Sequence, residues 1–160
     1  MMRVRTLLLG GLLAGGLLAL PDAAIATDTT AAETTDEADS LYVVAGELYA
    51  QKKYSDAIPL FRRVVELDPR RGNAFALLGG ALFQLGDYPQ AIGAFERALE
   101  LDEGIKLAYL GLVASNYLTQ RIEDAQEWLA RMVPILTGEE KARYLAMISA
   151  QFPDLDVPGI

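Results

Sequence analysis

The 160-residue sequence contains no cysteine and no histidine. Their absence excludes disulfide bonds, thiolate nucleophiles, zinc sites built from these residues, and acid–base catalysis by an imidazole. Catalysis would have to come from carboxylate, lysine, serine or tyrosine side chains alone. The acidic pairs Glu139-Glu140 and Asp154 with Asp156 fall at an expected helix start and in a proline-flanked tail, where we expect no pocket. We therefore expect no enzyme activity, no cofactor and no metal site.

The chain also lacks a stripe of positive charge. Its formal net charge is −8, and the basic residues are scattered among acidic ones. Such a chain is repelled by phosphate backbones and by anionic lipid surfaces. The expected partner is another protein or a peptide, with no nucleic acid and no small-molecule substrate.

The first 26 residues have the order of a secretory signal peptide. Arg3 and Arg5 precede an uncharged run from Leu7 to Leu20, and Ala24-Ile25-Ala26 forms an A-x-A cleavage motif. As a helix, the run would be about 21 Å long, shorter than the roughly 30 Å hydrocarbon core of a bilayer. We predict cleavage after Ala26 and a periplasmic or secreted protein. The alternative is an uncleaved anchor, and only then would the protein contact a membrane.

Residues 27–40 are low in complexity and consist mostly of threonine, alanine, aspartate and glutamate. A segment with so few apolar side chains cannot bury enough surface to pack against a core. We predict a disordered, solvated linker over these residues.

From Leu41 onward the sequence repeats with a period of 34 residues. Within each unit apolar residues recur at steps of three and four, which is the helical pattern. Gly86-Asp87 separates two helices in the second unit, and Asp68-Pro69 ends the first. Since neither helix of a unit can bury its apolar face alone, successive helix pairs should stack. The aligned columns are Leu41, Phe75 and Tyr109; Val44, Leu78 and Leu112; Ala45, Gly79 and Val113; Tyr54, Tyr88 and Ile122; Ala57, Ala91 and Ala125; Phe61, Phe95 and Leu129; and Val64, Ala98 and Met132.

These columns resemble the tetratricopeptide-repeat (TPR) pattern of large residues at repeat positions 4, 7, 11 and 24 and small ones at 8, 20 and 27. The second repeat matches it with Phe75, Leu78, Gly79, Leu82, Ala91, Phe95 and Ala98, and the first with Leu41, Val44, Ala45, Leu48, Ala57 and Phe61. The resemblance covers about residues 38–137, as repeats at about 38–71, 72–105 and 106–137. It implies an all-α, right-handed superhelix (an α-solenoid) of three helix-turn-helix repeats.

The third repeat departs from the pattern, with Val113, Asn116, Met132 and Thr137 in place of small, large, small and proline residues. Pro134 should kink or shorten its last helix. Residues 139–152 begin with acids, which suit a helix N-terminus, and we predict a capping helix there. The proline-rich residues 153–160 should form an extended tail. Its Leu155, Val157 and Ile160 are candidates for docking in a groove of this chain or of a neighbour.

The resemblance also implies a groove, because in TPR proteins the first helix of each repeat lines the concave side at positions 2, 5, 9 and 12. Position 12 holds Tyr49, Phe83 and Tyr117; position 5 holds Tyr42, Ala76 and Leu110, with Tyr144 in the matching place of the capping helix. Position 9 holds only small residues. The alternative is that these side chains serve ordinary packing between helices.

TPR grooves that clamp a terminal carboxylate use lysine, asparagine and arginine, where this chain has Tyr42, Gly46, Leu107 and Gly111. The groove should therefore suit a peptide or helix with apolar anchors. We predict a non-enzymatic interaction module that acts as a periplasmic scaffold or assembly factor. Two alternatives remain open: a cytoplasmic chaperone that resembles the translocator chaperones of type III secretion and holds an extended client segment, and a membrane-anchored adaptor with an uncleaved N-terminus.

Overall fold

The structure is a computed structural model that describes residues 23–157, with side chains described from residue 33. The predicted signal peptide lies outside the described residues except for residues 23–26, so its cleavage stays a prediction. Ile160 of the tail also lies outside them.

The described chain folds into seven α-helices and one short 3-10 helix, as the all-α prediction required. Their bounds are α1 Ala23–Ala50, α2 Tyr54–Leu67, α3 Gly72–Gln84, α4 Tyr88–Leu101, α5 Lys106–Leu118, α6 Ile122–Met132, η1 Val133–Ile135 and α7 Gly138–Gln151. No helix in this part of the chain combines the length and the apolar character that a bilayer crossing requires.

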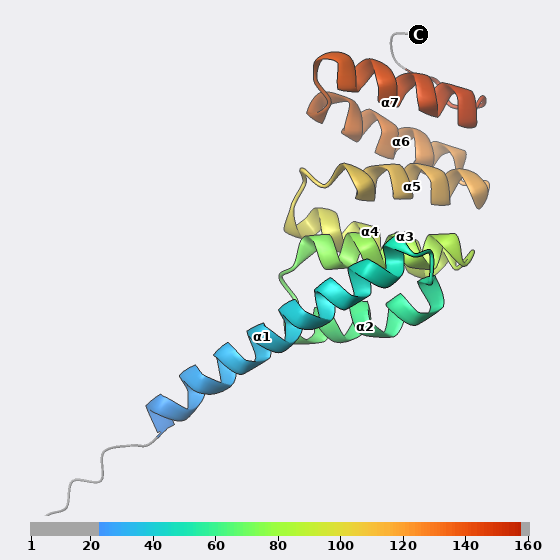
Figure 1. Cartoon of the computed structure of the whole chain (residues 1–160). Helices are drawn as coiled ribbons and strands as arrows, with labels where there is room; N and C mark the ends of the chain where they lie inside the picture. Colours follow the sequence, from blue (N-terminus) through green and yellow to red (C-terminus); the bar gives the residue numbers. More distant parts are fainter. Residues whose placement is uncertain (1–22, 158–160) are drawn as a thin grey trace, which may run out of the picture.

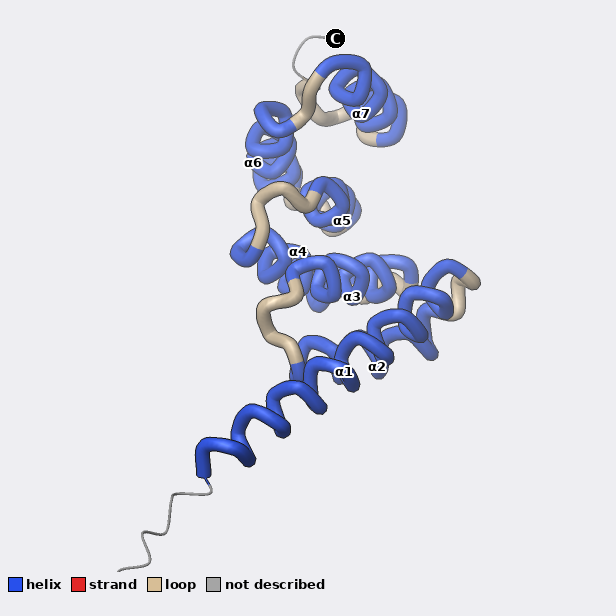
Figure 2. Tube along the Cα trace, turned by 60° about the vertical axis from the view of Figure 1, so that its left-hand side comes forward, coloured by secondary structure: helices blue, strands red, loops and turns tan. Residues whose placement is uncertain are grey.

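The first six helices form three antiparallel pairs, α1/α2, α3/α4 and α5/α6, which stack one on the next (Figures 1 and 2). The first helices of successive pairs are neighbours, because α1 contacts α3 and α3 contacts α5. Helix α7 lies at the end of the stack opposite to α1 (Figure 2). The predicted stack of three repeats with a capping helix is therefore confirmed.

The turn inside each pair has the same backbone form. Lys52, Gly86 and Gln120, which are spaced by one repeat, have φ of 60°, 81° and 61°. In each case the next N–H donates to a carbonyl five residues earlier, as from Lys53 to Leu48 at 2.9 Å. The left-handed residue turns the chain so that the N–H after it can bond to one of the last free carbonyls of the helix, and this ends the helix. Only the second repeat has glycine there, so the repeated fold, and not glycine alone, imposes the turn.

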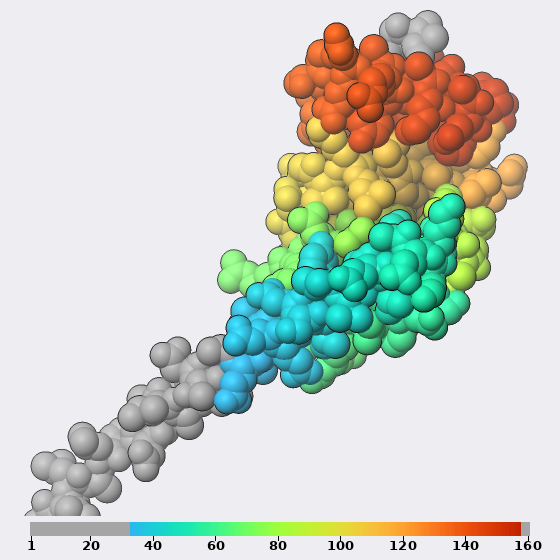
Figure 3. Space-filling view, viewed as in Figure 1, coloured from blue at the N-terminus to red at the C-terminus, as the bar shows by residue number. Residues whose placement is uncertain are grey.

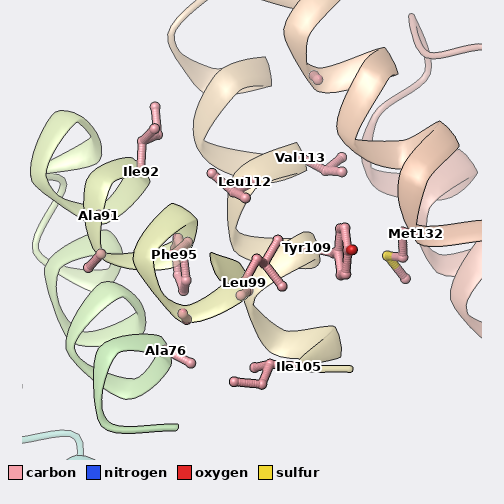
Figure 4. Packing of buried hydrophobic residues seen from close by; sticks show 14 of the residues in the cluster. Ala76, Ala91, Ile92, Phe95, Leu99, Ile105, Tyr109, Leu112, Val113 and Met132 are labelled. Atoms are coloured by element: carbon pink, nitrogen blue, oxygen red, sulfur yellow. The ribbon is translucent and has the colours of Figure 1, made fainter. Parts of the chain in front are cut away.

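Packing between the pairs centres on Phe95 of α4, which is 1% exposed. A Cβ atom added at Gly79 of α3 would lie 2.8 Å from its ring, and one at Gly111 of α5 would lie 2.2 Å away. The ring thus sits directly against the backbone of two helices. Figure 4 shows it among Leu99, Leu112 and their apolar neighbours. Small residues at these positions are a steric requirement of the stack.

Residues 27–40 differ from the prediction of a disordered linker, since they form much of the N-terminal half of α1. Alanine favours helix, and extending an existing helix avoids the unfavourable nucleation step. The stack also holds the C-terminal part of this segment. Ala38 is fully buried, Glu37 pairs with Arg63 of α2 at 3.3 Å, and Asp39 pairs with Arg71 before α3. In the space-filling view the first coloured residues of α1, from residue 33 on, lie at the edge of the molecule (Figure 3).

The end of the third repeat follows the prediction for Pro134. Helix α6 stops at Met132, and Pro134 lies inside the 3-10 turn η1. Gly138, with φ of 52°, then starts α7. The third repeat also buries two polar side chains, Ser115 and Asn116, whose Oγ and Oδ1 atoms have no hydrogen-bond partner among the described residues.

Candidate functional site

A hollow of about 430 Å³ lies between α3, α5 and α7. Phe83 of α3 borders it on one side, and Met147 and Phe152 border it from α7 and the residue that follows. The remaining apolar lining comes from α5, through Leu107, Leu110 and Ala114. Leu107 is 40% exposed and Met147 is 38% exposed, so both lie open to an incoming side chain.

A second hollow of about 330 Å³ adjoins the first and shares Leu110 and Met147 with it. Tyr144 and Arg143 of α7 complete its lining. Arg143 is the one charged residue among the described residues that line the two hollows. Together they form an apolar groove along α5 and α7, with a cationic side chain at the α7 side. We call this the α5–α7 groove.

Helix α7 is tied to α5 at one border of this groove. The Lys106 ammonium lies 2.6 Å from both carboxylate oxygens of Glu140. The tail forms further links: the Tyr117 hydroxyl donates to Asp154 Oδ2 at 2.8 Å, and its ring centroid lies 4.9 Å from that of Phe152. These contacts position Met147 and Phe152 beside the hollow.

The groove unites three of the seven residues predicted to line it: Phe83, Leu110 and Tyr144. The Phe83 ring also contacts Tyr88 of α4, with centroids 5.4 Å apart, so one of its faces rests on the stack. Tyr117 lies next to the groove but is partly covered by Phe152 and Asp154.

The other three predicted residues belong to packing. Ala76 is 1% exposed. Tyr42 lies edge-on to Phe61 and beneath the Arg71 guanidinium, 5.2 Å from the ring centroid. Tyr49 contacts Tyr54 and Phe61, at 5.3 and 6.4 Å between centroids. Burial, and secondly the nearby Tyr54, raises the pKa of Tyr49.

The tail docks on its own chain, beside the groove. Leu155 and Val157 are 6% and 8% exposed. The Gln126 side-chain amide of α6 donates to the Asp156 carbonyl at 2.6 Å and accepts from the Asp156 N–H at 2.9 Å. The described part of the tail, residues 153–157, therefore packs as part of this molecule and does not line the α5–α7 groove.

Met147 and Phe152 were missed by sequence reasoning. For Leu107, sequence reasoning gave only the conclusion that a clamp residue is lacking there. Its place at position 2 of the third repeat, a position that lines the concave side in TPR proteins, is a signal that could have identified it. No comparable signal exists for Met147 and Phe152, because both come after the 3-10 turn η1 and lie beyond the three aligned repeats.

Two family models described as tetratricopeptide repeat match the chain, one over residues 45–104 and the other over 82–150. No curated protein matches it. Among solved structures, the Yersinia enterocolitica type III secretion chaperone SycD in complex with a peptide of the translocator YopD is 20% identical, with a TM-score of 0.66, and covers 73% of this chain and 89% of that one.

Two further structures show the same fold. The first TPR of Spaghetti (RPAP3) bound to the HSP90 peptide SRMEEVD is 22% identical, has a TM-score of 0.64 and covers 74% of this chain and 95% of that one. The TPR2B domain of yeast Sti1 in its pHsp70 complex is 18% identical, with a TM-score of 0.59, and covers 72% and 88%. With the repeat columns, the stacked helix pairs and the two overlapping family models, these likenesses agree on one assignment: the chain belongs to the tetratricopeptide-repeat family.

Proposed function

We propose that this protein is a non-enzymatic binding module that holds a peptide or helix with apolar anchors in the α5–α7 groove. The observation that carries the proposal is the open apolar lining: Leu107 of α5 and Met147 of α7 both line a hollow of about 430 Å³ and remain 40% and 38% exposed. Grooves of stacked helix pairs are surfaces that repeat proteins use for binding.

The groove also indicates the character of the guest. Its lining is apolar apart from glutamines and Arg143, so apolar side chains of the guest provide the binding energy. Burying about 400 Å² of apolar surface contributes roughly 10 kcal/mol before association costs of about 4 to 15 kcal/mol are subtracted. At most about 6 kcal/mol remains, so a dissociation constant of tens of micromolar or weaker is expected.

The solved structures support a peptide guest. SycD was solved with a YopD peptide, RPAP3 with an HSP90 peptide and Sti1 with pHsp70. The apolar lining of this groove differs in chemistry from a carboxylate clamp. This difference favours a peptide that binds through apolar side chains within its sequence over one that binds through its charged chain end. The likeness to SycD favours, as a second candidate, a chaperone for an extended client segment.

A site-specific cross-linking experiment tests the proposal. A photoreactive amino acid is placed at Leu107, at Met147 and, as a control, at Leu85, which is 52% exposed but does not line the groove. The two groove positions should cross-link to one segment of one partner, and the control should not. Equal labelling from all three positions would contradict the groove.

The captured segment then allows a binding measurement. A synthetic peptide of that segment should bind wild type with a dissociation constant of tens of micromolar or weaker. Leu107→Glu and Met147→Glu should each weaken it at least tenfold, since they place a charge in the apolar lining, while Leu85→Glu should not. Circular dichroism confirms the fold of each variant. Undiminished binding by both groove variants would refute the assignment.

The N-terminal sequence supports a proposal for the compartment in which the protein acts. We propose a periplasmic scaffold or assembly factor, on the basis of the signal-peptide pattern in residues 1–26. Fractionation with N-terminal sequencing tests this: a chain starting at Thr27 in the periplasm is expected. A chain starting at Met1 in the membrane would identify the anchored adaptor, and one confined to the cytoplasm would favour the chaperone.

A further inference from the structure

The α5–α7 groove has one charged side chain in an otherwise uncharged lining. Arg143 of α7 lines the smaller hollow, about 330 Å³ in volume, together with Tyr144. The described residues that line the larger hollow carry no charge, and the only side-chain amides among them belong to two glutamines. A guest that contributed only apolar side chains would therefore leave a guanidinium group beside them without a counter-charge.

Arg143 is exposed and has no carboxylate partner within the described residues. Glu139 lies one turn earlier on α7, at the spacing of a helical ion pair, yet no ion pair joins it to Arg143. The next acid, Glu140, is held by Lys106 at 2.6 Å. The guanidinium of Arg143 is thus available to a ligand. All ion pairs of the described residues use other cations: Arg63, Arg71, Arg97, Lys106 and Arg121.

Helices α5 and α7 run side by side in the same direction. Near their first turns, Lys106 pairs with Glu140 at 2.6 Å. Near their ends, the ring centroid of Tyr117 lies 4.9 Å from that of Phe152. The groove between them therefore has two different ends, because Arg143 lies toward the starts of the helices and Phe152 borders the far end.

The spacing along α7 sets the order of side chains in an extended guest. Met147 lines both hollows and follows Arg143 by four residues, so the two lie on one face of the helix, about 6 Å apart along its axis. Side chains on one face of an extended chain are two residues and about 6.6 Å apart. A guest residue beside Arg143 is therefore followed, two positions on, by a residue beside Met147.

We propose that the guest of the α5–α7 groove carries one acidic side chain two residues from its first apolar anchor, and that Arg143 binds this carboxylate. This inference rests on the proposed function and adds the chemistry of the partner. A guanidinium group donates two parallel hydrogen bonds to a carboxylate, and an apolar lining that excludes water strengthens them. The formal net charge of −8 favours a single acid, because the chain as a whole repels an acid-rich segment.

The arrangement differs from a clamp for a terminal carboxylate. Arg143 belongs to the capping helix, beyond the three repeats, and the clamp positions of the third repeat hold Leu107 and Gly111. The group bound is therefore a side chain within the guest and not its chain end. Apolar anchors give the guest its affinity, and Arg143 selects its charge and its direction along the groove.

Selection from a peptide library tests this inference. Random dodecapeptides, each fused at its C-terminus so that no chain end is free, are selected on the full protein as it is found in the cell. Wild type should enrich pairs of apolar residues with aspartate or glutamate two positions from one of them, and Arg143→Glu should enrich lysine or arginine there. Apolar peptides without a preferred charge would overturn this inference and leave the proposed function standing. Recovery of no apolar peptide would overturn both.

Matched synthetic peptides measure the contact itself. The most enriched sequence, blocked at both ends, is made with glutamate, glutamine or lysine at the acidic position. Wild type should bind the glutamate form about three- to fivefold more tightly than the glutamine form, as for a partly exposed ion pair, and the lysine form most weakly. Arg143→Gln should abolish the preference for glutamate and keep the affinity for the glutamine form.

Two further variants separate the causes. Lys141→Gln removes the same charge from α7 but lies outside the lining of both hollows, so it should keep the preference for glutamate. An equal loss of preference in Lys141→Gln and Arg143→Gln would indicate a general field and overturn the contact. Met147→Glu should weaken all three peptides, which tests the groove independently of its charge. Circular dichroism checks the fold of each variant.

Discussion

Both ends of this stack are tetratricopeptide repeats, but within the described residues further chain covers only the C-terminal one. At the C-terminal end, α7 and the tail cover the third repeat, and Leu112 of that repeat is fully buried. The backbone of Gly111, next to Leu112, lies against the Phe95 ring of the second repeat. At the N-terminal end, no described atom outside the adjoining backbone of α1 lies within 4 Å of a Cβ added at Gly46, and Val44 is half exposed. Repeat position 7 is therefore a fully buried core site at Leu112 in the third unit and a half-exposed surface site at Val44 in the first. Neighbours, more than residue type, determine the cost of a change.

The largest contrast is expected between two glycines. Gly111→Ala should destabilise the fold by about 2 to 3 kcal/mol, because the buried Phe95 ring cannot move away from the new methyl group. Gly46→Ala should stabilise it by about 0.5 to 1 kcal/mol through helix propensity. Urea unfolding at equal protein concentration measures both. Similar midpoints for the two variants would show that the ring has room to move.

A smaller contrast is expected between two apolar residues at the ends. Leu155→Ala should cost about 2 kcal/mol, because its side chain is 6% exposed and leaves a cavity. Val44→Ala should cost less than about 0.5 kcal/mol, since half of its surface is already in water. Thermal unfolding gives the difference. Hydrogen exchange should quicken in α7 for the first variant only, and unchanged exchange there would argue against the tail as a cover.

Asn116 offers a stabilising change. Its Oδ1 is buried and has no hydrogen-bond partner in the part of the chain that the structure describes, and the equivalent positions of the first two repeats hold Leu48 and Leu82. Asn116→Leu should stabilise the protein by about 1 kcal/mol, because the gain from removing an unsatisfied acceptor exceeds the loss of the bond from Nδ2 to the Leu112 carbonyl. Urea unfolding checks the sign. A loss of stability would show that the amide makes a contact that apolar packing cannot replace.

The smallest effect concerns two tyrosines. The hydrogen bond to Asp154 raises the pKa of Tyr117, whereas burial raises the pKa of Tyr49. Since the folded-state pKa is the higher one, the Tyr117–Asp154 contact contributes below the ordinary value of 10.0 and is lost as pH rises through the raised value. Asp154→Ala should lower the pKa of Tyr117 and leave that of Tyr49 unchanged. Ultraviolet titration of single Tyr→Phe variants assigns each measured pKa to Tyr49 or to Tyr117. A parallel shift of both would indicate a global opening.

Sequence reasoning predicted the helix pairs because their signals are local. The spacing of Leu41, Phe75 and Tyr109 fixes the period. Pro134 ends its helix through local backbone sterics, whatever the helix packs against. Sequence reasoning failed for residues 27–40, where polar composition suggested disorder, because Ala38 and the acids Glu37 and Asp39 find partners far along the chain.

The candidate site was predicted only in part for the same reason. Tyr49, Phe83 and Tyr117 share a repeat position, yet only Phe83 lines the hollow. Tyr49 packs on Tyr54, and the tail covers part of Tyr117. Predicting the role of a residue from its aligned position assumes that equivalent residues have the same neighbours in every repeat. In this chain, neither the first nor the last repeat meets that assumption.

Helix α1 has a mechanical consequence. It is 28 residues long, or about 42 Å, and residues 23–36 extend some 20 Å beyond the Glu37–Arg63 pair. A continuous helix resists bending far more than a loose leash of equal length. The N-terminal part of α1 therefore acts as a rigid arm, whose far end is held at a set distance and direction from the stacked repeats.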